Sequence, residues 1–167
     1  MVYIGVGSNI DPTHNIPLAL DALMRELEVM QSSTFYWSKA VARENQEPFL
    51  NGVWSLKTLR EARELKFDLL RKIEADLGRQ RSADKHAART IDLDLLLYHE
   101  QVIDEENLTV PDPEIGARSF LSIPLGELAP ELLPLSSGPS LPELEPDTPF
   151  TQIIRAAIAA QQSTPPS

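Results

Sequence analysis

Strand-like and helix-like segments alternate along the first part of the chain, and their order most narrows the possible fold. Apolar residues alternate with other residues in strands, whereas they recur every three or four positions in amphipathic helices. By composition and these patterns we expect strands at residues 2–7, 30–40, 50–58 and 91–98, and helices at 14–29 and 58–77. The order strand–helix–strand–strand–helix–strand predicts an α+β fold, a ferredoxin-like antiparallel sheet (βαββαβ core) with helices on one face.

Individual residues mark the ends of the second helix. Thr58 and Glu61 match the capping-box pattern, in which a hydroxyl and a carboxylate accept hydrogen bonds from each other's backbone N–H groups, so the helix is expected to begin there. Gly78 follows the last apolar residue, where a glycine commonly ends a helix. The expected buried residues of this helix are Ala62, Leu65, Leu69, Ile73 and Leu77.

The remainder of the chain adds elements to this core. A short extended piece at 102–103 is expected to pair with the strand before it, a helix is expected near 118–128, and a proline-rich irregular region at 130–147. Thr148 as the N-cap and Pro149 in the first turn predict a last helix. Its expected buried residues are Phe150, Ile153, Ile154, Ala157 and Ile158. These additional C-terminal helices are expected to cover more of the sheet.

Length and composition limit both the number of domains and the possible chemistry. A chain of 167 residues fits one domain, which we place at residues 1–160, followed by a flexible tail at 161–167. Cysteine is absent, which excludes disulfides and thiol nucleophiles, and the three histidines lack the spacing of a zinc pair. Since no apolar run can cross a membrane and no signal-peptide pattern follows Met1, we expect a cytoplasmic protein with no membrane partner.

The charge is acidic overall but locally reversed. The chain carries 15 Lys and Arg against 25 Asp and Glu, a net charge of −10, which argues against nucleic-acid binding because such binding depends on basic surface. Residues 71–90 instead hold six basic and three acidic residues, a local charge of +3. A cationic patch on an acidic protein favours a small anionic ligand, and a solvated helix end and loop is the alternative.

The strand at 91–98 carries the strongest chemical signal. On one face it is expected to bury Ile91, Leu93, Leu95 and Leu97. Asp92 and Asp94 then share the other face about 6.6 Å apart, and two carboxylates so placed suit one or two hard cations such as Mg²⁺. The basic loop at 79–90 comes directly before them, and Mg²⁺ beside Arg and Lys side chains would hold a polyphosphate. The alternative is an exposed acidic strand that the neighbouring arginines merely neutralise.

Four sequence blocks occur here in an order that is known from one enzyme family. They are YIGVGSN at 3–9, FLN at 49–51, IEADLGRQRSADKHAARTIDLDLLLY at 73–98 and LTVPDPEIGARSFLSIPLGELAPEL at 108–132. With these blocks the chain resembles the 6-hydroxymethyl-7,8-dihydropterin pyrophosphokinases, enzymes of folate biosynthesis. The resemblance spans residues 2–132, and the R-T-I-D-L-D block combined with the later V-P, R-S-F and P-L-x-E-L-A-P motifs is specific to that family.

The resemblance implies a reaction and a set of residues for it. ATP donates its β,γ-pyrophosphoryl group to the hydroxymethyl group of the pterin, and AMP is released. Asp92 and Asp94 are implied to hold two Mg²⁺ ions that bridge the ATP phosphates, with Arg79, Arg81 and Arg89 as further catalytic residues. The residues implied on the ATP side are Glu74, Arg79, Lys85, Arg89, Thr109 and Arg118. Both substrates are small molecules, and a monomer is expected.

The resemblance also implies a pterin site. The family stacks the pterin between two aromatic rings and binds its edge with an asparagine, and Phe49, Phe120 and Asn51 fall at these positions. A flat heterocycle gains from aromatic faces, and an amide both donates and accepts hydrogen bonds. Taken singly, each of the three residues also fits a plain structural role, as a core phenylalanine or a polar strand end.

Several positions depart from the family pattern. Residues 38–40 read Ser-Lys-Ala where the family usually has Thr-Pro-Pro, Lys85 stands in place of an arginine, and His86 stands in place of a tryptophan. Asp112 and Pro113 occupy positions where a histidine and an aromatic residue are usual. The replacement of this histidine by Asp112 removes a possible hydrogen-bond donor to phosphate and adds a negative charge near ATP.

Three functions remain in competition at this point. Because the acidic pair and the arginines are retained, we favour an active pterin pyrophosphokinase. The departures favour the second, an altered family member that binds pterin or nucleotide without efficient transfer. The third is a ferredoxin-like interaction domain whose acidic strand face is only solvated.

Overall fold

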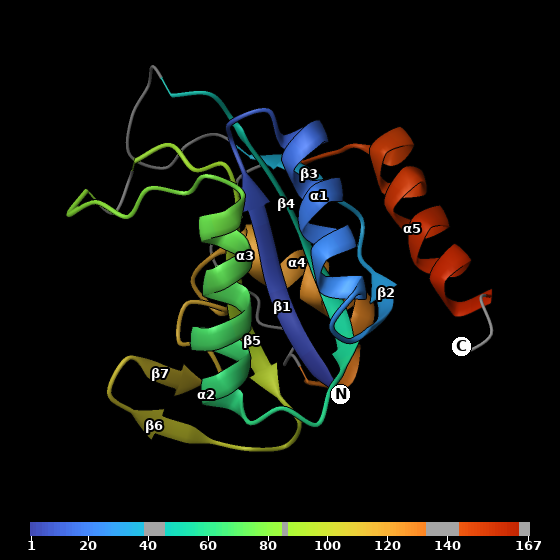
Figure 1. Cartoon of the computed structure of the whole chain (residues 1–167). Helices are drawn as coiled ribbons and strands as arrows, with labels where there is room; N and C mark the ends of the chain where they lie inside the picture. The colour runs from blue at the N-terminus through green and yellow to red at the C-terminus, as the bar shows by residue number, and fades with distance from the viewer. Residues whose placement is uncertain (39–45, 85–86, 133–143, 164–167) are drawn as a thin grey trace.

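The computed structural model of the chain describes residues 1–38, 46–84, 87–132 and 144–163. Its main sheet contains β1 (Val2–Ser8), β2 (Glu28–Ser32), β3 (Tyr36–Ser38), β4 (Phe49–Lys57), β5 (Asp92–Tyr98) and β8 (Glu145–Pro146). The strand order is β5-β1-β4-β3-β8, with β2 also paired to β4, and every pair is antiparallel (Figure 1). A separate hairpin consists of β6 (Ile103–Glu105) and β7 (Leu108–Val110).

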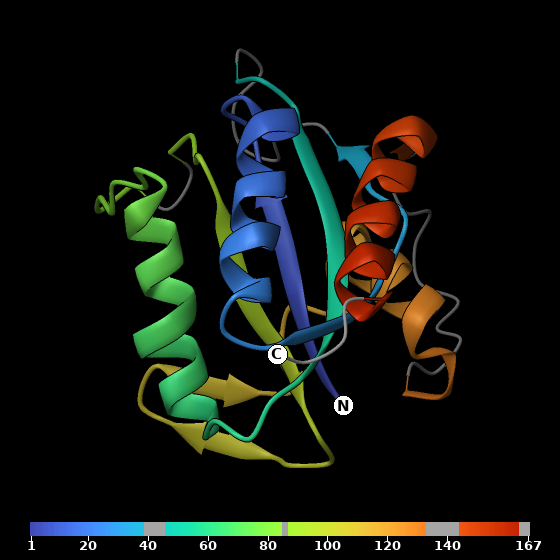
Figure 2. The ribbon, with the colours of Figure 1, turned by 45° about the vertical axis from the view of Figure 1, so that its right-hand side comes forward.

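Helices cover both faces of the sheet. They are α1 (Pro12–Met24), α2 (Ala62–Glu64), α3 (Arg71–Asp76), α4 (Ser119–Leu128) and α5 (Thr148–Ser163). A π-helical turn, Leu65–Leu70, joins α2 to α3 in one helical segment. Figures 1 and 2 show α1, this segment and α5 on one face of the sheet and α4 on the other. The predicted α+β, ferredoxin-like fold with additional C-terminal helices is confirmed.

The two faces of the sheet bury separate hydrophobic clusters. On the face of α1, the cluster includes Val2, Ile4, Val6, Leu20, Leu23, Leu50, Trp54, Leu56, Leu70, Leu93 and Leu95. On the face of α4, it comprises Tyr3, Val53, Leu96, Ile115, Leu121, Leu125 and Ala129. Because successive strand residues point to opposite faces, β1 contributes to both clusters. The smaller α4 cluster leaves part of its face for polar groups.

The region predicted as one strand at 30–40 is two strands. β2 and β3 both pair with β4, but the chain between them leaves the ladder at Ser33. There the Ser33 hydroxyl accepts a hydrogen bond from the Val53 N–H at 2.8 Å, so a side chain replaces a backbone partner. The preceding helix, predicted to reach residue 29, ends at Met24, which leaves Val29 free to join β2.

The helical segment at 62–76 begins without the predicted capping box. Glu61 is the N-cap and makes no side-chain cap bond. Thr58 Oγ1 instead accepts a hydrogen bond from the Arg60 N–H at 3.1 Å. The predicted glycine end is confirmed, because Gly78 has φ +82°, and the N–H of the following Arg79 donates to the Glu74 carbonyl at 3.0 Å.

One side chain of β5 lies on the face opposite to the predicted one. The pairing of β1 with β5 shifts by one residue between Tyr3 and Ile4, which face Leu97 and Leu95. This bulge inserts Leu96 as an extra residue and reverses the alternation after it. Leu97 therefore packs with the α4 cluster, and Tyr98 joins the α1 cluster in its place.

The C-terminal part also differs in detail from the prediction. β6 pairs with β7 and not with β5, and residues 145–146 of the region expected to be irregular form β8 on β3. The N-cap of α5 is Asp147, whose Oδ1 accepts a hydrogen bond from the Phe150 N–H at 3.0 Å, and Thr148 is already inside the helix. Ile153, expected to be buried, is 62% exposed.

Side chains of α5 bind the backbone of β2. Gln162 donates to the Met30 carbonyl at 2.9 Å, and Arg155 donates to the Ser32 carbonyl at 3.1 Å. Figure 2 shows α5 running alongside this part of the sheet. Within the described residues β2 pairs with β4 alone, so α5 occupies its second edge. None of the helices in the described ranges is both long and apolar enough to span a membrane.

Candidate active site

Two glycines of β1 lie at the centre of a polar row across the sheet. Gly7 faces Asn51 on β4 and Asp92 on β5, and Gly5 faces Asp94 on β5. Opposite residues of paired strands share a face, so Asn51, Asp92 and Asp94 lie on the α4 side. A Cβ at Gly7 would lie only 2.5 Å from Asn51 Oδ1, so the glycine permits the close approach of this amide.

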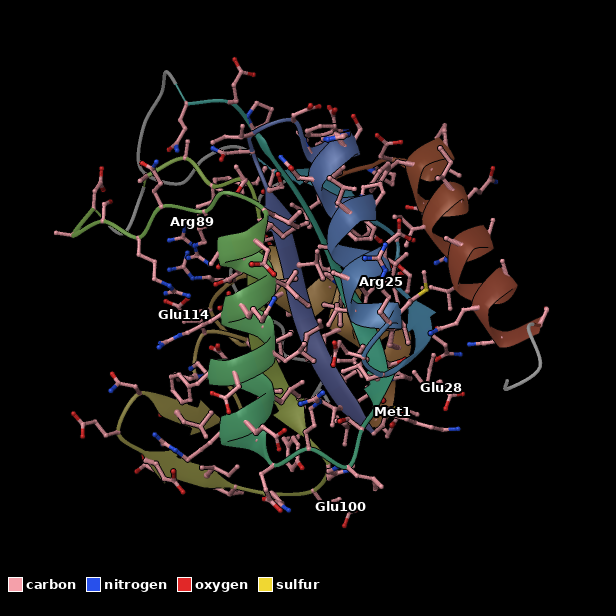
Figure 3. The ribbon with its side chains drawn as sticks, in the orientation of Figure 1. Met1, Arg25, Glu28, Arg89, Glu100 and Glu114 are labelled. Atoms are coloured by element: carbon pink, nitrogen blue, oxygen red, sulfur yellow. The ribbon has the colours of Figure 1, made fainter. Side chains whose placement is uncertain are left out.

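A chain of ion pairs surrounds Asp92. Glu74 of α3 pairs with Arg79 and, at 2.6 Å, with Arg81. Arg79 also contacts Asp92 at 2.6 Å, and Arg89 pairs with the other oxygen of Asp92. The sequence-predicted residues Glu74, Arg79, Arg81, Arg89 and Asp92 are thus brought together, and Arg89 lies beside α3 in Figure 3.

Glu74 anchors this network from inside the protein. It is 2% exposed, and Glu74 Oε1 accepts a hydrogen bond from the Leu93 N–H at 2.8 Å. Burial raises the pKa of Glu74, against the opposing effects of that N–H and of Arg79. Burial would by itself lower the pKa of Arg79, but the carboxylates of Asp92 and Glu74 outweigh it and raise that pKa. Arg79 therefore stays charged, and the network holds Asp92 in one orientation.

Asn9 fixes the start of the Arg89 segment. Its side-chain oxygen accepts a hydrogen bond from the Arg89 N–H at 2.7 Å, and its own N–H donates to the Arg89 carbonyl at 3.1 Å. Asn9 itself is buried. The turn after β1 thus positions the guanidinium that contacts Asp92.

Asp94 differs from Asp92 in having no neutralising partner. Its side chain is open to solvent, and none of the arginines or lysines in the described residues forms an ion pair with it. The protein atoms packed around the carboxyl desolvate its charged form, and the carboxylates of Asp92 and Glu74 repel a further negative charge; together they raise the pKa of Asp94 to about 8. Without a cation, Asp94 is therefore largely protonated at neutral pH, because the site accommodates a second negative charge poorly.

The donor set at this place fits Mg²⁺. Asp92 and Asp94 supply carboxylate oxygens on one face, and Mg²⁺ in phosphoryl-transfer sites is commonly held by one or two carboxylates plus substrate phosphates. A cation beside Asp94 would also relieve the repulsion that raises its pKa. The described residues contain no cluster of three or more His, Cys, Asp or Glu side chains suited to a metal ion, so further ligands would come from substrate and water.

The predicted pterin-binding residues lie on the same side of the sheet. Phe49 and Asn51 belong to the start of β4, and Asn51 donates to the Ser38 hydroxyl at 2.8 Å. Phe120 comes from α4 and packs, half-buried, against the cluster of that face. The Arg118 guanidinium lies 5.6 Å from the centre of the Phe120 ring. Aromatic and amide groups therefore stand next to the acidic pair.

Comparison with known proteins identifies the family. A sequence profile of the 7,8-dihydro-6-hydroxymethylpterin-pyrophosphokinase family matches residues 3–130. The chain belongs to this family. It is 40% identical over 157 residues to the 2-amino-4-hydroxy-6-hydroxymethyldihydropteridine pyrophosphokinase of Pseudomonas aeruginosa, covering 92% of this chain and 95% of the relative.

Two further relatives carry the same name. The pyrophosphokinase of Aquifex aeolicus is 38% identical over 159 residues, which cover 92% of this chain and 98% of the relative. That of Haemophilus influenzae is 36% identical over 135 residues, which cover 78% of this chain and 82% of the relative. The resemblance that the motifs indicated is thereby confirmed.

Some residues expected from the pyrophosphokinase family lie apart from the network or outside the described residues. Thr109 is exposed on β7, opposite Asp104, and lies away from the ion pairs around Asp92. Lys85 and His86, together with residues 39–40, fall outside the described ranges. Arg118 contacts Phe120 but forms an ion pair with Glu114 at 2.7 Å, and Glu114 is labelled in Figure 3.

Asp112, the departure from the pyrophosphokinase pattern, has a clear structural role. Its N–H donates to the Leu96 carbonyl at 2.9 Å, and its carboxylate accepts a hydrogen bond from the Glu114 N–H at 2.8 Å. Burial raises the pKa of Asp112, and the Glu114 N–H opposes this shift. Asp112 thus stabilises the turn before α4 next to β5, and it adds negative charge near Asp94.

Two further cations lie near the site: Lys66, which the sequence did not single out, and Arg71, which belongs to the cationic patch at 71–90. Lys66 donates to the Asn107 carbonyl at 2.8 Å, and the charges of Asp94 and Asp112 act on its amine. Arg71 lies near Arg79 and Arg81, whose charges act on it. Helical periodicity marked the apolar residues of this segment and placed neither cation at the site. The π-helical turn that places them together has no signature in the spacing of apolar residues.

Proposed function

We propose that this protein transfers pyrophosphate from ATP to 6-hydroxymethyl-7,8-dihydropterin, giving the pterin diphosphate and AMP, as a Mg²⁺-dependent monomeric enzyme of folate biosynthesis in the cytoplasm. The observation that carries the proposal is the pairing of Asp92 and Asp94 on one face of the sheet, beside the network of Glu74, Arg79, Arg81 and Arg89. The names of the relatives support it.

In this proposal Asp92 and Asp94 hold Mg²⁺, which when bound neutralises phosphate charge and keeps the triphosphate in place. Arg79 and Arg89 hold the Asp92 carboxylate from two sides, so its orientation is fixed before substrate arrives. The rigid network reduces the reorganisation needed at the reaction centre, which is how such sites lower the barrier to phosphoryl transfer.

The proposed transfer is a displacement at the β-phosphorus of ATP. The hydroxymethyl oxygen of the pterin forms the new bond to phosphorus, and the bond to the α,β-bridging oxygen breaks, so that this oxygen leaves with AMP. The hydroxyl proton passes to a carboxylate of the acidic pair or to water. The protein's main contributions are alignment and charge stabilisation, since no covalent intermediate is required.

The pterin is proposed to stack on Phe49 and Phe120, with Asn51 at its edge. The Ser38 hydroxyl accepts from the Asn51 amide and limits its rotation, so the amide is presented in one orientation. On the nucleotide side we propose Glu74, Arg79, Arg81, Lys85, Arg89, Thr109 and Arg118. Among these, Arg81 and Arg118 are the partly exposed guanidiniums available to phosphate oxygens in the described residues.

Product analysis tests this function directly. Purified protein is incubated with ATP, Mg²⁺ and 6-hydroxymethyl-7,8-dihydropterin, and nucleotides and pterins are separated. AMP that appears only with the pterin, together with a pterin diphosphate, is expected. ADP in place of AMP would mean transfer of a single phosphate and would refute the proposal.

The second candidate is a family member that binds nucleotide or pterin without efficient transfer. It is favoured by Asp112, whose carboxylate adds negative charge beside Asp94. Binding of ATP without pterin-dependent AMP would support this candidate. Asp112→His would then be expected to raise turnover, and unchanged turnover would exclude Asp112 as the cause.

A further inference from the structure

The helical segment at 62–76 contains a π-helical turn at the level of the acidic site. The Arg71 N–H donates to the Lys66 carbonyl, five residues earlier, instead of to the carbonyl four residues earlier as in an α-helix. In an α-helix, residues five apart point in directions about 140° apart. The wider turn brings Lys66 and Arg71 toward a common side. Single π-helical turns within α-helices are frequently found at functional sites.

One aromatic ring connects the two cations. The Lys66 Nζ lies 5.5 Å and the Arg71 Cζ 4.3 Å from the centre of the Phe67 ring. Phe67 is half-buried and packs against the α1 cluster, so the ring is anchored. A cation above an aromatic face at these distances is attracted to the ring electrons. Phe67 therefore makes a favourable contact with each of the two cations.

Lys66 and Arg71 are not neutralised as the other site cations are. Arg79, Arg81 and Arg89 each pair with Glu74 or Asp92. In the part of the chain that the structure describes, neither Lys66 nor Arg71 forms an ion pair with a carboxylate. Lys66 uses one of its three N–H donors on the Asn107 carbonyl at 2.8 Å, which fixes its direction and leaves donors for a ligand.

The pair lies next to the open side of the acidic site. Burial lowers the pKa of Lys66, while the nearby carboxylates of Asp94 and Asp112 favour its charged form and Arg71 opposes it. The Asp112 N–H donates a hydrogen bond to the carbonyl of Leu96, which follows Asp94 by two residues on β5. Asp112 therefore lies against this part of the strand. Lys66 thus lies close enough to Asp94 and Asp112 for their charges to act on its amine.

We propose that Lys66 and Arg71 form a phosphate-binding pair beside Asp94, aligned by the π-helical turn, that attracts and positions the nucleotide. This inference rests on the proposed function, in which a nucleoside triphosphate approaches the acidic pair. In their ionised forms, Asp94 and Asp112 would otherwise repel such a ligand. Two positive charges without carboxylate partners offset that repulsion and add direct donors to phosphate oxygens.

Binding measurements on single variants test the pair. Lys66→Met and Arg71→Met are titrated with α,β-methylene-ATP and Mg²⁺ by calorimetry, at low and at high salt, and their steady-state kinetics are measured. Each variant is expected to raise the Kd and the KM for the nucleotide about tenfold, equal to about 1.4 kcal/mol, with kcat within about twofold of wild type. The dependence of Kd on salt is expected to become shallower.

Matched variants separate a charge effect from a packing effect. Lys72→Met removes a lysine of the same helical segment that is exposed and paired with Asp76 at 2.5 Å, and it is expected to bind as wild type does. Lys66→Arg and Arg71→Lys keep the charges and are expected to restore most of the affinity. Lys66→Gln and Arg71→Gln replace the methionine variants if thermal unfolding shows that those fail to fold.

The outcomes distinguish this inference from the function on which it rests. If wild type binds the analogue and makes AMP, while Lys66→Met and Arg71→Met match Lys72→Met in Kd, the inference is wrong and the function stands. A fall in kcat with unchanged KM and Kd also overturns it, because the pair would then not bind the nucleotide. If wild type neither binds the analogue nor makes AMP, the function and the inference both fail.

Discussion

Replacing Asp94 with asparagine is expected to stabilise the protein in the absence of metal while removing its activity. The pKa of Asp94 is raised to about 8, first by desolvation and then by the charges of Asp92 and Glu74. Between the ordinary carboxyl pKa and this value, the folded protein binds more protons than the unfolded chain. The stability of wild type therefore falls as the pH rises through this window. The amide side chain of the variant cannot ionise, so its folded state escapes this loss.

The size of the effect follows from the shift and from the exposure of the side chain. A rise from an ordinary value near 4 to about 8 corresponds to about 5 kcal/mol if all of it appears as stability. Asp94 is exposed, so water screens the repulsion and reduces this to about 1–2 kcal/mol. For a chain of this size, that difference raises the Tm by about 2–8 °C.

Thermal unfolding with a chelator present measures this difference at several pH values. We expect Asp94→Asn and wild type to have the same Tm near pH 4. The Tm of the variant should exceed that of wild type by a margin that grows up to pH 9. Asp21→Asn, on the exposed surface of α1, controls for the amide substitution itself. Added Mg²⁺ is expected to raise the Tm of wild type and not that of Asp94→Asn. A variant that is equally or less stable at pH 9 would refute the reasoning that Asp94 carries unrelieved negative charge.

Substitutions at three other places give separate tests. Asp92→Ala is expected to abolish pterin-dependent AMP formation in a folded protein, and turnover near the wild-type rate would remove Asp92 from the metal site. Gly7→Ala places a Cβ 2.5 Å from Asn51 Oδ1 and should raise the KM for the pterin about tenfold by displacing the amide, while the KM for ATP stays the same. Ile154→Ala on the buried side of α5 should cost about 2–4 kcal/mol in chemical unfolding, whereas Ile153→Ala on its exposed side should cost under about 0.5 kcal/mol, and equal losses would contradict the packing of α5.

The sequence predicted the parts of this fold that depend on regular hydrophobic repeats. The order of strands and helices and the glycine end of the second helix followed from patterns that act within a few residues. Leu97 was placed on the wrong face because a bulge next to Leu96 reverses the alternation, and such a bulge depends on the pairing with β1. Ile153 was assigned to the core because its spacing fits a wide apolar stripe, whereas α5 buries only a narrower one.

The sequence predicted the part of the site that lies on a single strand and in the loop before it. Asp92 and Asp94 share a face by the two-residue repeat of any strand, and the arginines before them lie close in sequence. Glu74 reaches the network through its buried bond to the Leu93 N–H, a contact between distant segments that spacing does not reveal. The π-helical turn rotates Lys66 and Arg71 toward a common side, whereas a helical wheel with regular spacing separates them.

The contacts of α5 with β2 have a consequence for the order of events during synthesis. β2 is made early, yet the side chains that bind its second edge, Arg155 and Gln162, leave the ribosome only after the rest of the sheet. Until then, a nascent chain carries an open strand edge, the kind of surface on which other strands assemble. The last helix therefore works as a closure of the sheet. Chains truncated before it would be expected to associate through β2 even though every residue of the acidic pair and its arginine network is already present.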